Sequence, residues 1–217
     1  GDSEDLSREP KKRHIVDDRT DLDSEKGRLQ KEARSRAHME THLPKNKWCH
    51  ICNASKMVSA HTTITKGSES EPTKKFGDKL TADTFFEKRH LTAYDGSKCA
   101  LCMLDIHTYW KDVAPAGNKN TYESIKALNG FVGPRTKVGS LYTDNAKELK
   151  EAAETLEWVH VTSTPYASHT NGVIERAIRR CEEGTKCLLA QAGLNNRWWP
   201  LAAKCFCFSC LLYTSPS

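Results

Sequence analysis

Two acidic residues, Asp144 and Glu175, stand where the sequence pattern changes from one element to the next. Asp144 follows the apolar run 138–142 and precedes Asn145, which together with Glu148 makes a capping-box-like start to a helix. Glu175 follows an Asn-Gly turn signal, at the start of a helix with an apolar stripe. The stripe consists of Ile174, Ile178, Cys181, Leu188 and Ala192. Since Glu175 is one position off this stripe, we expect both carboxylates to project from rigid elements towards a cleft.

Histidines and cysteines cluster in residues 38–52. His38 and His42 are four residues apart and so lie on one side of a helical turn. Cys49 and Cys52 have the Cys-x2-Cys spacing of a metal-binding knuckle. Two imidazoles and two thiolates complete a tetrahedral zinc site, whereas the alternative is a surface histidine pair beside two ordinary thiols. His50, between the cysteines, is the residue most easily mistaken for a ligand.

The composition fits one medium-sized domain with a small appendage, because 37% of the 217 residues are hydrophobic. The net charge of +5 is compatible with a nucleic-acid partner. An apolar run of about 18 residues and a secretory leader are both missing from the sequence, so no membrane partner is expected. Nine cysteines, an odd number, then indicate thiols or metal ligands in a reducing compartment.

The remaining pattern alternates between strands and helices, which predicts a mixed sheet with helices packed against it. Strands are expected at 76–86, 98–105, 109–114, 138–142 and 158–162, and helices at 120–128, from 145 and from 172. Gly130 is expected to end the first of these helices.

Several residues of reactive types are interpreted as structural. Cys99 and Cys102 are three apart in a strand and so point to opposite faces, which prevents them from sharing a metal. The other residues interpreted in this way are the turn acids Asp78, Asp95 and Asp105 and the packing cysteines Cys205, Cys207 and Cys210.

Further short sequence motifs follow the histidine and cysteine cluster. They are TAD at Asp83, YTDN at Asp144, TPYASHTNGVIER around Glu175, and then AQAGL and RWWP. Over roughly residues 38–208 the chain resembles the integrase of a copia-type LTR retrotransposon, which is part of a retrovirus-related Pol polyprotein. The resemblance implies a ribonuclease H-like α/β fold preceded by a small zinc-binding module. It also implies a polynucleotidyl transferase that inserts element cDNA into host DNA.

The resemblance assigns the catalytic acids as well. Asp83, Asp144 and Glu175 carry over as the first, second and third acids of an Asp-Asp-Glu site that binds two Mg²⁺ (or Mn²⁺) ions. Hard cations of this kind take oxygen ligands, and a pair of them activates the incoming oxygen and stabilises the departing one. Asp83 is expected to bridge both ions, with one further acid on each ion. Zn²⁺ is the second implied cofactor.

Residues around Glu175 are the candidates for DNA contacts. They are Asn171, Arg176, Arg179, Arg180 and Lys186, with the polar loop 165–172 placed to touch target DNA. The alternative for the basic residues is a solvated helix face. The resemblance further implies a homo-oligomer on DNA, formed in a cytoplasmic virus-like particle and active in the nucleus. Residues 10–13 are read as an ordinary basic cluster, with a nuclear-import address as the alternative.

The expected domain organisation is a charged disordered or linker segment (1–36), a zinc-binding module (37–60), a linker (61–75), a truncated catalytic core (76–210) and a non-native tail (211–217). The tail is judged non-native because CLLYTSPS resembles a translated sequencing adaptor. Two other functions are kept as alternatives. One is a nuclease of the same fold that cleaves RNA–DNA hybrids, and the other is a catalytically inactive or domesticated copy that only binds DNA.

Overall fold

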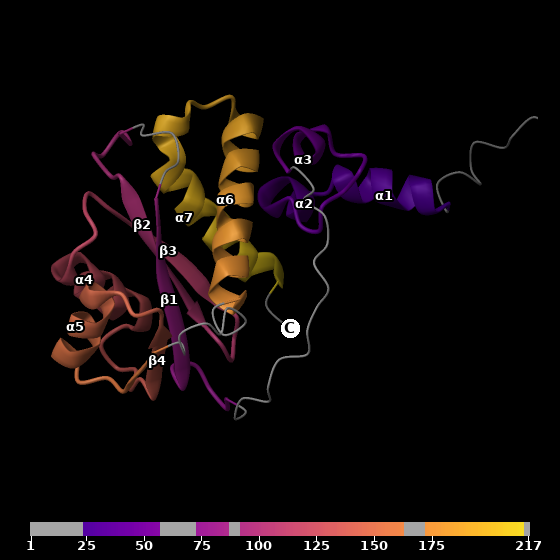
Figure 1. Ribbon diagram of the computed structural model, residues 1–217. Coiled ribbons are helices and arrows are strands. Elements are labelled where there is room, and N and C mark those ends of the chain that lie inside the picture. Colours follow the sequence, from indigo (N-terminus) through magenta and orange to yellow (C-terminus); the bar gives the residue numbers. More distant parts are fainter. Residues whose placement is uncertain (1–23, 57–72, 87–91, 163–171, 215–217) are drawn as a thin grey trace, which may run out of the picture.

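A computed structural model describes residues 24–56, 73–86, 92–162 and 172–214 of the chain (Figure 1). The basic run 10–13, Asn171 and residues 165–171 of the polar loop lie outside the described residues. None of the helices in the described ranges is both long and apolar enough to cross a bilayer.

Five strands form one mixed sheet in the order β3-β2-β1-β4-β5. The strands are β1 (Lys79–Phe86), β2 (Cys99–Asp105), β3 (Lys111–Ala116), β4 (Ser140–Thr143) and β5 (His160–Thr162). The first three pair antiparallel, whereas β4 pairs parallel with β1 and β5 pairs parallel with β4. Parallel neighbours require crossover connections, which α4 (Thr121–Val132) and α5 (Lys147–Thr155) provide. β1 therefore has a hydrogen-bonded strand on each side.

Helices cover both faces of this sheet (Figure 1). α4 and α5 pack on one face, and α6 (Gly172–Ala192) and α7 (Trp199–Thr214) pack on the other, joined by the short 3-10 helix η2 (Asn196–Trp198). β2 is buried at every position because Leu101 and Met103 face the first layer while Ala100, Cys102 and Leu104 face the second. The sheet and its two helical layers confirm the predicted ribonuclease H-like fold class.

Three short helices form a module at the side of the core: α1 (Glu25–Ala33), α2 (Arg36–Thr41) and α3 (His50–Ser55). Figure 1 shows this module beside α6 and α7, and the closest packing joins α2 to α7 and α3 to α6. The segment through residue 36, expected to be a linker or frayed helix, contains α1 and the first residue of α2. The side chain of Ser24 caps α1 by accepting from Gly27 N, and Asn46 Nδ2 ties the helix to the module by donating to Leu29 O.

Two helix ends differ from the predictions. α4 continues through Gly130 to Val132 and ends at Gly133, whose positive φ of 71° suits glycine and whose N–H donates to Asn129 O. α5 begins after Ala146, so the capping box predicted from residues 145 and 148 does not form. In its place Asp144 Oδ1 accepts a hydrogen bond from Ala146 N at 3.2 Å.

Two side chains predicted to be packed are exposed instead. Cys205 lies on the outer side of α7, although Cys207 and Cys210 are buried as predicted. Ala192 is exposed in the last turn of α6, so the buried face of that helix ends earlier than the stripe suggests. α7 itself continues beyond residue 210 to Thr214.

Candidate active site and metal centre

The four predicted zinc ligands converge in the module. His38 lies in α2, His42 follows that helix, and Cys49 and Cys52 lie at the start of α3. All four side chains are buried, and their ligand atoms lie within 4.8 Å of one another. His50 is exposed and takes no part, although it stands between the cysteines.

The distances within this group fit a tetrahedral ion. His42 Nδ1 is 3.6 Å from both Cys49 Sγ and Cys52 Sγ, and His38 Nε2 is 3.5 Å from Cys52 Sγ. Zinc bonds of ordinary length to nitrogen and sulfur, set at tetrahedral angles, place such atoms about 3.6 Å apart. Burial lowers the pKa of both imidazoles, which favours the neutral form that binds a metal. The donor set and its geometry therefore suit Zn²⁺.

Sheet register determines where two of the acids stand. Thr81 of β1 pairs with Tyr142 of the parallel strand β4. Asp83 lies two residues further along β1, and Asp144, two residues beyond Tyr142, directly follows the end of β4. Phe85, which points to the same side of β1 as Asp83, packs against the α6–α7 core. The Asp83 side chain therefore faces the layer in which α6 carries Glu175 in its first turn.

The charges of these acids interact. Burial raises the pKa of Asp83 first of all, and the neighbouring charges of Asp144 and Glu175 raise it further. The Thr84 N–H, which donates to Asp83 Oδ1 at 2.7 Å, and the Lys119 ammonium oppose this rise. Asp83 and Asp144 are half-buried, whereas Glu175 is exposed. Oxygen donors that repel one another in this way suit a hard divalent cation.

The acids are not drawn together as tightly as the zinc ligands. Within the described ranges, the histidine and cysteine group is the only set of three or more potential ligands close enough to share one ion. The arrangement brings Asp83, Asp144 and Glu175 to one side of the sheet and into electrostatic contact, and their assignment as metal ligands stays a prediction.

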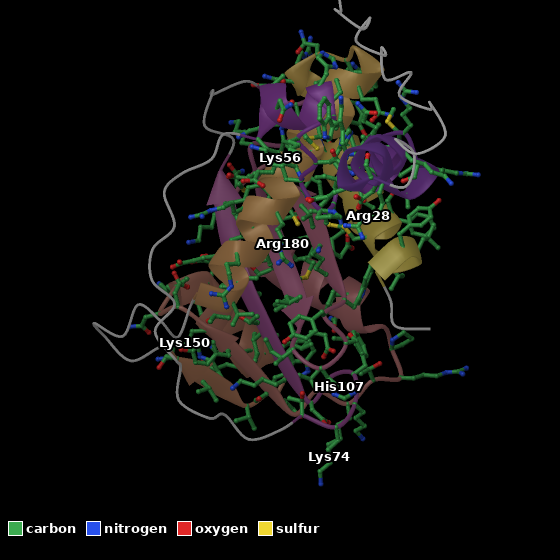
Figure 2. The ribbon with its side chains drawn as sticks, turned by 90° about the vertical axis from the view of Figure 1, so that its right-hand side faces the viewer. Arg28, Lys56, Lys74, His107, Lys150 and Arg180 are labelled. Carbon is green, nitrogen blue, oxygen red and sulfur yellow. The ribbon has the colours of Figure 1, made fainter. Side chains whose placement is uncertain are left out.

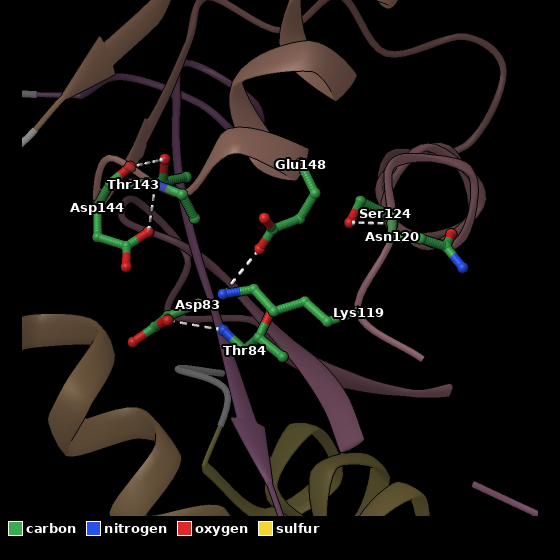
Figure 3. A network of polar contacts seen from close by, with 9 residues as sticks. Asp83, Thr84, Lys119, Asn120, Ser124, Thr143, Asp144 and Glu148 are labelled. Carbon is green, nitrogen blue, oxygen red and sulfur yellow. Dashed lines mark hydrogen bonds and ion pairs between the residues drawn. The ribbon is translucent and has the colours of Figure 1, made fainter. Parts of the chain in front are cut away.

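A lysine that no sequence pattern singled out, Lys119, lies beside Asp83 (Figure 3). Lys119, in the connection between β3 and α4, forms an ion pair of 2.8 Å with Glu148 Oε1 in the first turn of α5. It also lowers the pKa of Asp83 by its charge. The neighbouring Asn120 caps α4 by accepting from Glu123 N at 2.8 Å. In the sequence the only signal was a lysine between two asparagines in a polar turn, which is common on protein surfaces.

The end of β4 is held by a second set of contacts. Thr143 Oγ1 lies 2.7 Å from the Asp144 carbonyl oxygen, to which it donates, and 2.8 Å from His160 Nε2 on β5. Figure 3 shows the bond to Asp144 together with the one that Asp144 Oδ1 accepts from Ala146. These contacts fix the backbone from which the Asp144 side chain projects.

The candidate DNA-contacting residues lie along the exposed side of α6. They are Arg176, Arg179, Arg180 and Lys186, all of them exposed. Figure 2 looks onto this side of the molecule and labels Arg180 on the helix. Spacings of three and four residues place Arg176, Arg179 and Arg180 on one face, and Lys186 joins them because it is seven residues, about two turns, after Arg179. Their role in DNA binding stays a prediction, and Asn171 lies outside the described residues.

The competing acids have structural roles, as predicted. Asp105 is fully buried and accepts hydrogen bonds from Gly77 N at 3.0 Å and from Thr108 N and Oγ1 at 2.7 Å. Asp78 accepts from two backbone N–H groups of the turn before β1, and Asp95 accepts from Ser97 N. Each of these carboxylates has at least one oxygen atom engaged in a turn, and Asp105 has both.

The cysteines of the core pack against one another. Cys181 Sγ and Cys207 Sγ are 3.7 Å apart, between α6 and α7, and Cys102 of β2 lies against them. Cys99 lies on the opposite side of β2 and donates to Ala116 O, which agrees with the prediction that Cys99 and Cys102 face different ways.

Comparisons with known proteins give structural similarity without sequence similarity. No protein-family model matches the chain, and no curated protein matches it significantly. A chain of the simian T-cell lymphotropic virus intasome, solved in complex with PP2A regulatory subunit B56 gamma, is similar with a TM-score of 0.49 and 15% identity over 71% of this chain. The similarity spans only 55% of that longer chain.

Two catalytic core domains are also similar in structure. The BIV integrase catalytic core has a TM-score of 0.46 and 14% identity, over 65% of this chain and 87% of its own. The HTLV-2 integrase catalytic core, solved in complex with magnesium in a trimeric form, has a TM-score of 0.43 and 18% identity, over 60% of this chain and 82% of its own.

Proposed function

We propose that this chain is the integrase part of a copia-type LTR-retrotransposon Pol polyprotein, a polynucleotidyl transferase that joins element cDNA ends to host DNA. The observation that carries the proposal is the placement of three carboxylates. Asp83 lies in β1, Asp144 directly follows the adjacent parallel strand β4, and Glu175 lies in the first turn of α6. The charges of Asp144 and Glu175 both raise the pKa of Asp83.

The chemistry assigns a role to each acid. Asp83, between the other two, would bridge a pair of Mg²⁺ or Mn²⁺ ions, while Asp144 and Glu175 would each hold one of them. When bound, such ions supply activation of the attacking oxygen and stabilisation of the leaving oxygen. Mutual repulsion among the acids favours cation binding, because a bound cation offsets it.

The exposed basic face of α6 would contact the DNA backbone. It begins at Arg176, directly after Glu175, and continues through Arg179 and Arg180 to Lys186. Phosphate contacts of this kind position a duplex without reading its sequence. We further propose that the protein acts as a homo-oligomer on DNA, in the nucleus, after assembly in a cytoplasmic virus-like particle.

Joining of a donor oligonucleotide to a target duplex tests the proposal. The wild-type chain is expected to join them in the presence of Mg²⁺, and Asp144→Asn is expected to reduce joining by about 100-fold or more. DNA binding by the variant should remain, because Asp144 supplies negative charge and no phosphate contact. Asp95→Asn is the matched control, since Asn also accepts the turn hydrogen bond from Ser97.

The outcomes separate the three candidate functions. Equal joining by wild type and Asp144→Asn would remove Asp144 from the mechanism. Cleavage of an RNA–DNA hybrid without joining would favour the nuclease. Salt-sensitive DNA binding with neither reaction would favour the DNA-binding relic.

A further inference from the structure

We propose that Gln191 is a positioning residue of the zinc centre, which holds His42 in the tautomer that presents Nδ1 to the metal and thereby connects the zinc module to α6. The inference rests on the zinc site proposed above and is independent of the transferase activity. Gln191 lies in the last turn of α6, which belongs to the core, and 149 residues separate it from His42 in the sequence.

The two nitrogens of His42 have different neighbours. Nδ1 points at Cys49 Sγ and Cys52 Sγ, at 3.6 Å from each. Nε2 points the opposite way and lies 2.7 Å from Gln191 Oε1. An imidazole that binds a metal through Nδ1 must carry its proton on Nε2, and a buried N–H needs an acceptor. The amide oxygen of Gln191 is that acceptor, and the bond leaves the Nδ1 lone pair directed at the metal position.

Gln191 is the partner that the module lacks within itself. His42 is fully buried, and its carbonyl oxygen accepts from Lys56 Nζ at 2.6 Å, which fixes the backbone but not the ring. The other imidazole provides a contrast. His38 Nε2 lies 3.5 Å from Cys52 Sγ, but its buried Nδ1 finds no partner among the described residues. Only one of the two histidines is therefore oriented by a group outside the module.

The His42–Gln191 hydrogen bond lies where the zinc module packs against the core. The module packs on α6 through α3 and on α7 through α2 (Figure 1), so the His42–Gln191 pair is part of that interface. α6 carries Glu175 at its other end, about 24 Å away along the helix axis. A metal that fixes the His42 ring consequently strengthens the contact between the module and the helix that bears the third acid.

The zinc affinity of the full chain tests the proposal. Affinity is measured by competition with a chromophoric chelator, and the visible spectrum of the Co²⁺-substituted chain reports ligand geometry. Gln191→Met removes the acceptor at similar volume and is expected to weaken zinc binding about 10-fold or more and to alter the Co²⁺ spectrum. Gln191→Glu keeps an acceptor and should bind zinc at least as tightly as the wild type.

The control is Gln30→Met, the same substitution at a half-buried position of α1, where the described part of the chain gives the side chain no hydrogen bond. It should change the affinity less than about twofold. Wild-type affinity and spectrum in Gln191→Met would overturn the proposal, as would equal weakening by Gln191→Met and Gln191→Glu, which would assign Gln191 a packing role. A wild-type chain that binds no zinc would also overturn it. Failure to join DNA, with these zinc results intact, would refute only the transferase.

Discussion

At Asp83, burial and neighbouring negative charge shift the carboxyl pKa in the same direction. Its pKa is raised first by burial and then by Asp144 and Glu175. A carboxyl group whose folded pKa exceeds its unfolded value lowers stability as the pH rises from the unfolded pKa, about 3.9, through the folded pKa. The full loss of folding stability is present above the folded pKa and absent below the unfolded pKa.

Asp83→Asn should therefore stabilise the divalent-metal-free protein at neutral pH. Asn keeps the oxygen that accepts from Thr84 N and removes the charge that burial and repulsion disfavour. We expect the Tm to rise by about 2 °C at pH 7, with the difference from wild type vanishing below about pH 4. Thermal denaturation across this pH range measures the effect. A variant less stable than wild type at pH 7 would show that the Asp83 charge is already compensated within the protein.

Local and distant residues differ in how far the sequence revealed them. The four zinc ligands lie within residues 38–52, so helical spacing and the Cys-x2-Cys knuckle were enough to select them. Asp144 could be selected as the acid at the end of a strand. Lys119 and Gln191 could not, because each acquires a role only when folding brings it beside Asp83 or His42. Asp83 was assigned from the family resemblance and not from its own pattern.

At the scale of elements, the sequence pattern predicted β1 to β5 and α4 to α6 in the correct order, and the continuous apolar run of β2 agrees with its burial on both faces. α7 was not predicted as a helix. The ends of the helices were less predictable. Gly130 and Gly133 are both potential terminators, and the helix continues past Gly130 through the buried Phe131 and Val132 before it ends at Gly133. The start of α5 was predicted one residue early, with Asn145 as the cap in place of Ala146, and the Glu148 side chain pairs with Lys119 instead of completing a capping box.

α6 and α7 approach each other closely at Gly184, in the middle of α6. A Cβ atom built on Gly184 would collide with the ring of Phe206 on α7, so the absence of a side chain permits the two helices to pack. The ring is fully buried and has no room to withdraw. Glycine at this position therefore serves packing, at a cost in helix propensity of about 1 kcal/mol.

Gly184→Ala should destabilise the chain by about 1–3 kcal/mol through overpacking, despite the gain in helix propensity. Gly130→Ala is the matched control, since this glycine is also inside a helix but meets nothing within 4 Å in the described structure. The control should be neutral or stabilising by up to about 1 kcal/mol. Denaturant unfolding of both variants measures the contrast. A stabilising Gly184→Ala would contradict the close packing of α6 and α7.

At the scale of the whole molecule, the two helical layers differ in what they offer to DNA. The α6 layer presents Arg176, Arg179, Arg180 and Lys186 beside the candidate acids, whereas the α4–α5 layer covers the opposite face of the sheet. The small net charge of +5 does not distinguish the layers. If binding depends on where the cations lie, substitutions on one layer should matter and those on the other should not.

The salt dependence of DNA binding distinguishes binding through the cations of α6 from binding through net charge alone. Each phosphate contact adds about 0.9 to the slope of log K against log salt concentration, because binding releases a condensed counterion. The double variant Arg176→Ala/Arg179→Ala should therefore lower the slope by about 2 and weaken binding to unrelated sequences to the same extent. Lys126→Ala/Lys150→Ala removes the same charge from exposed positions of α4 and α5 and should leave the slope unchanged. Equal decreases in both double variants would mean that DNA senses only the net charge, and the α6 face would then have no special part in binding.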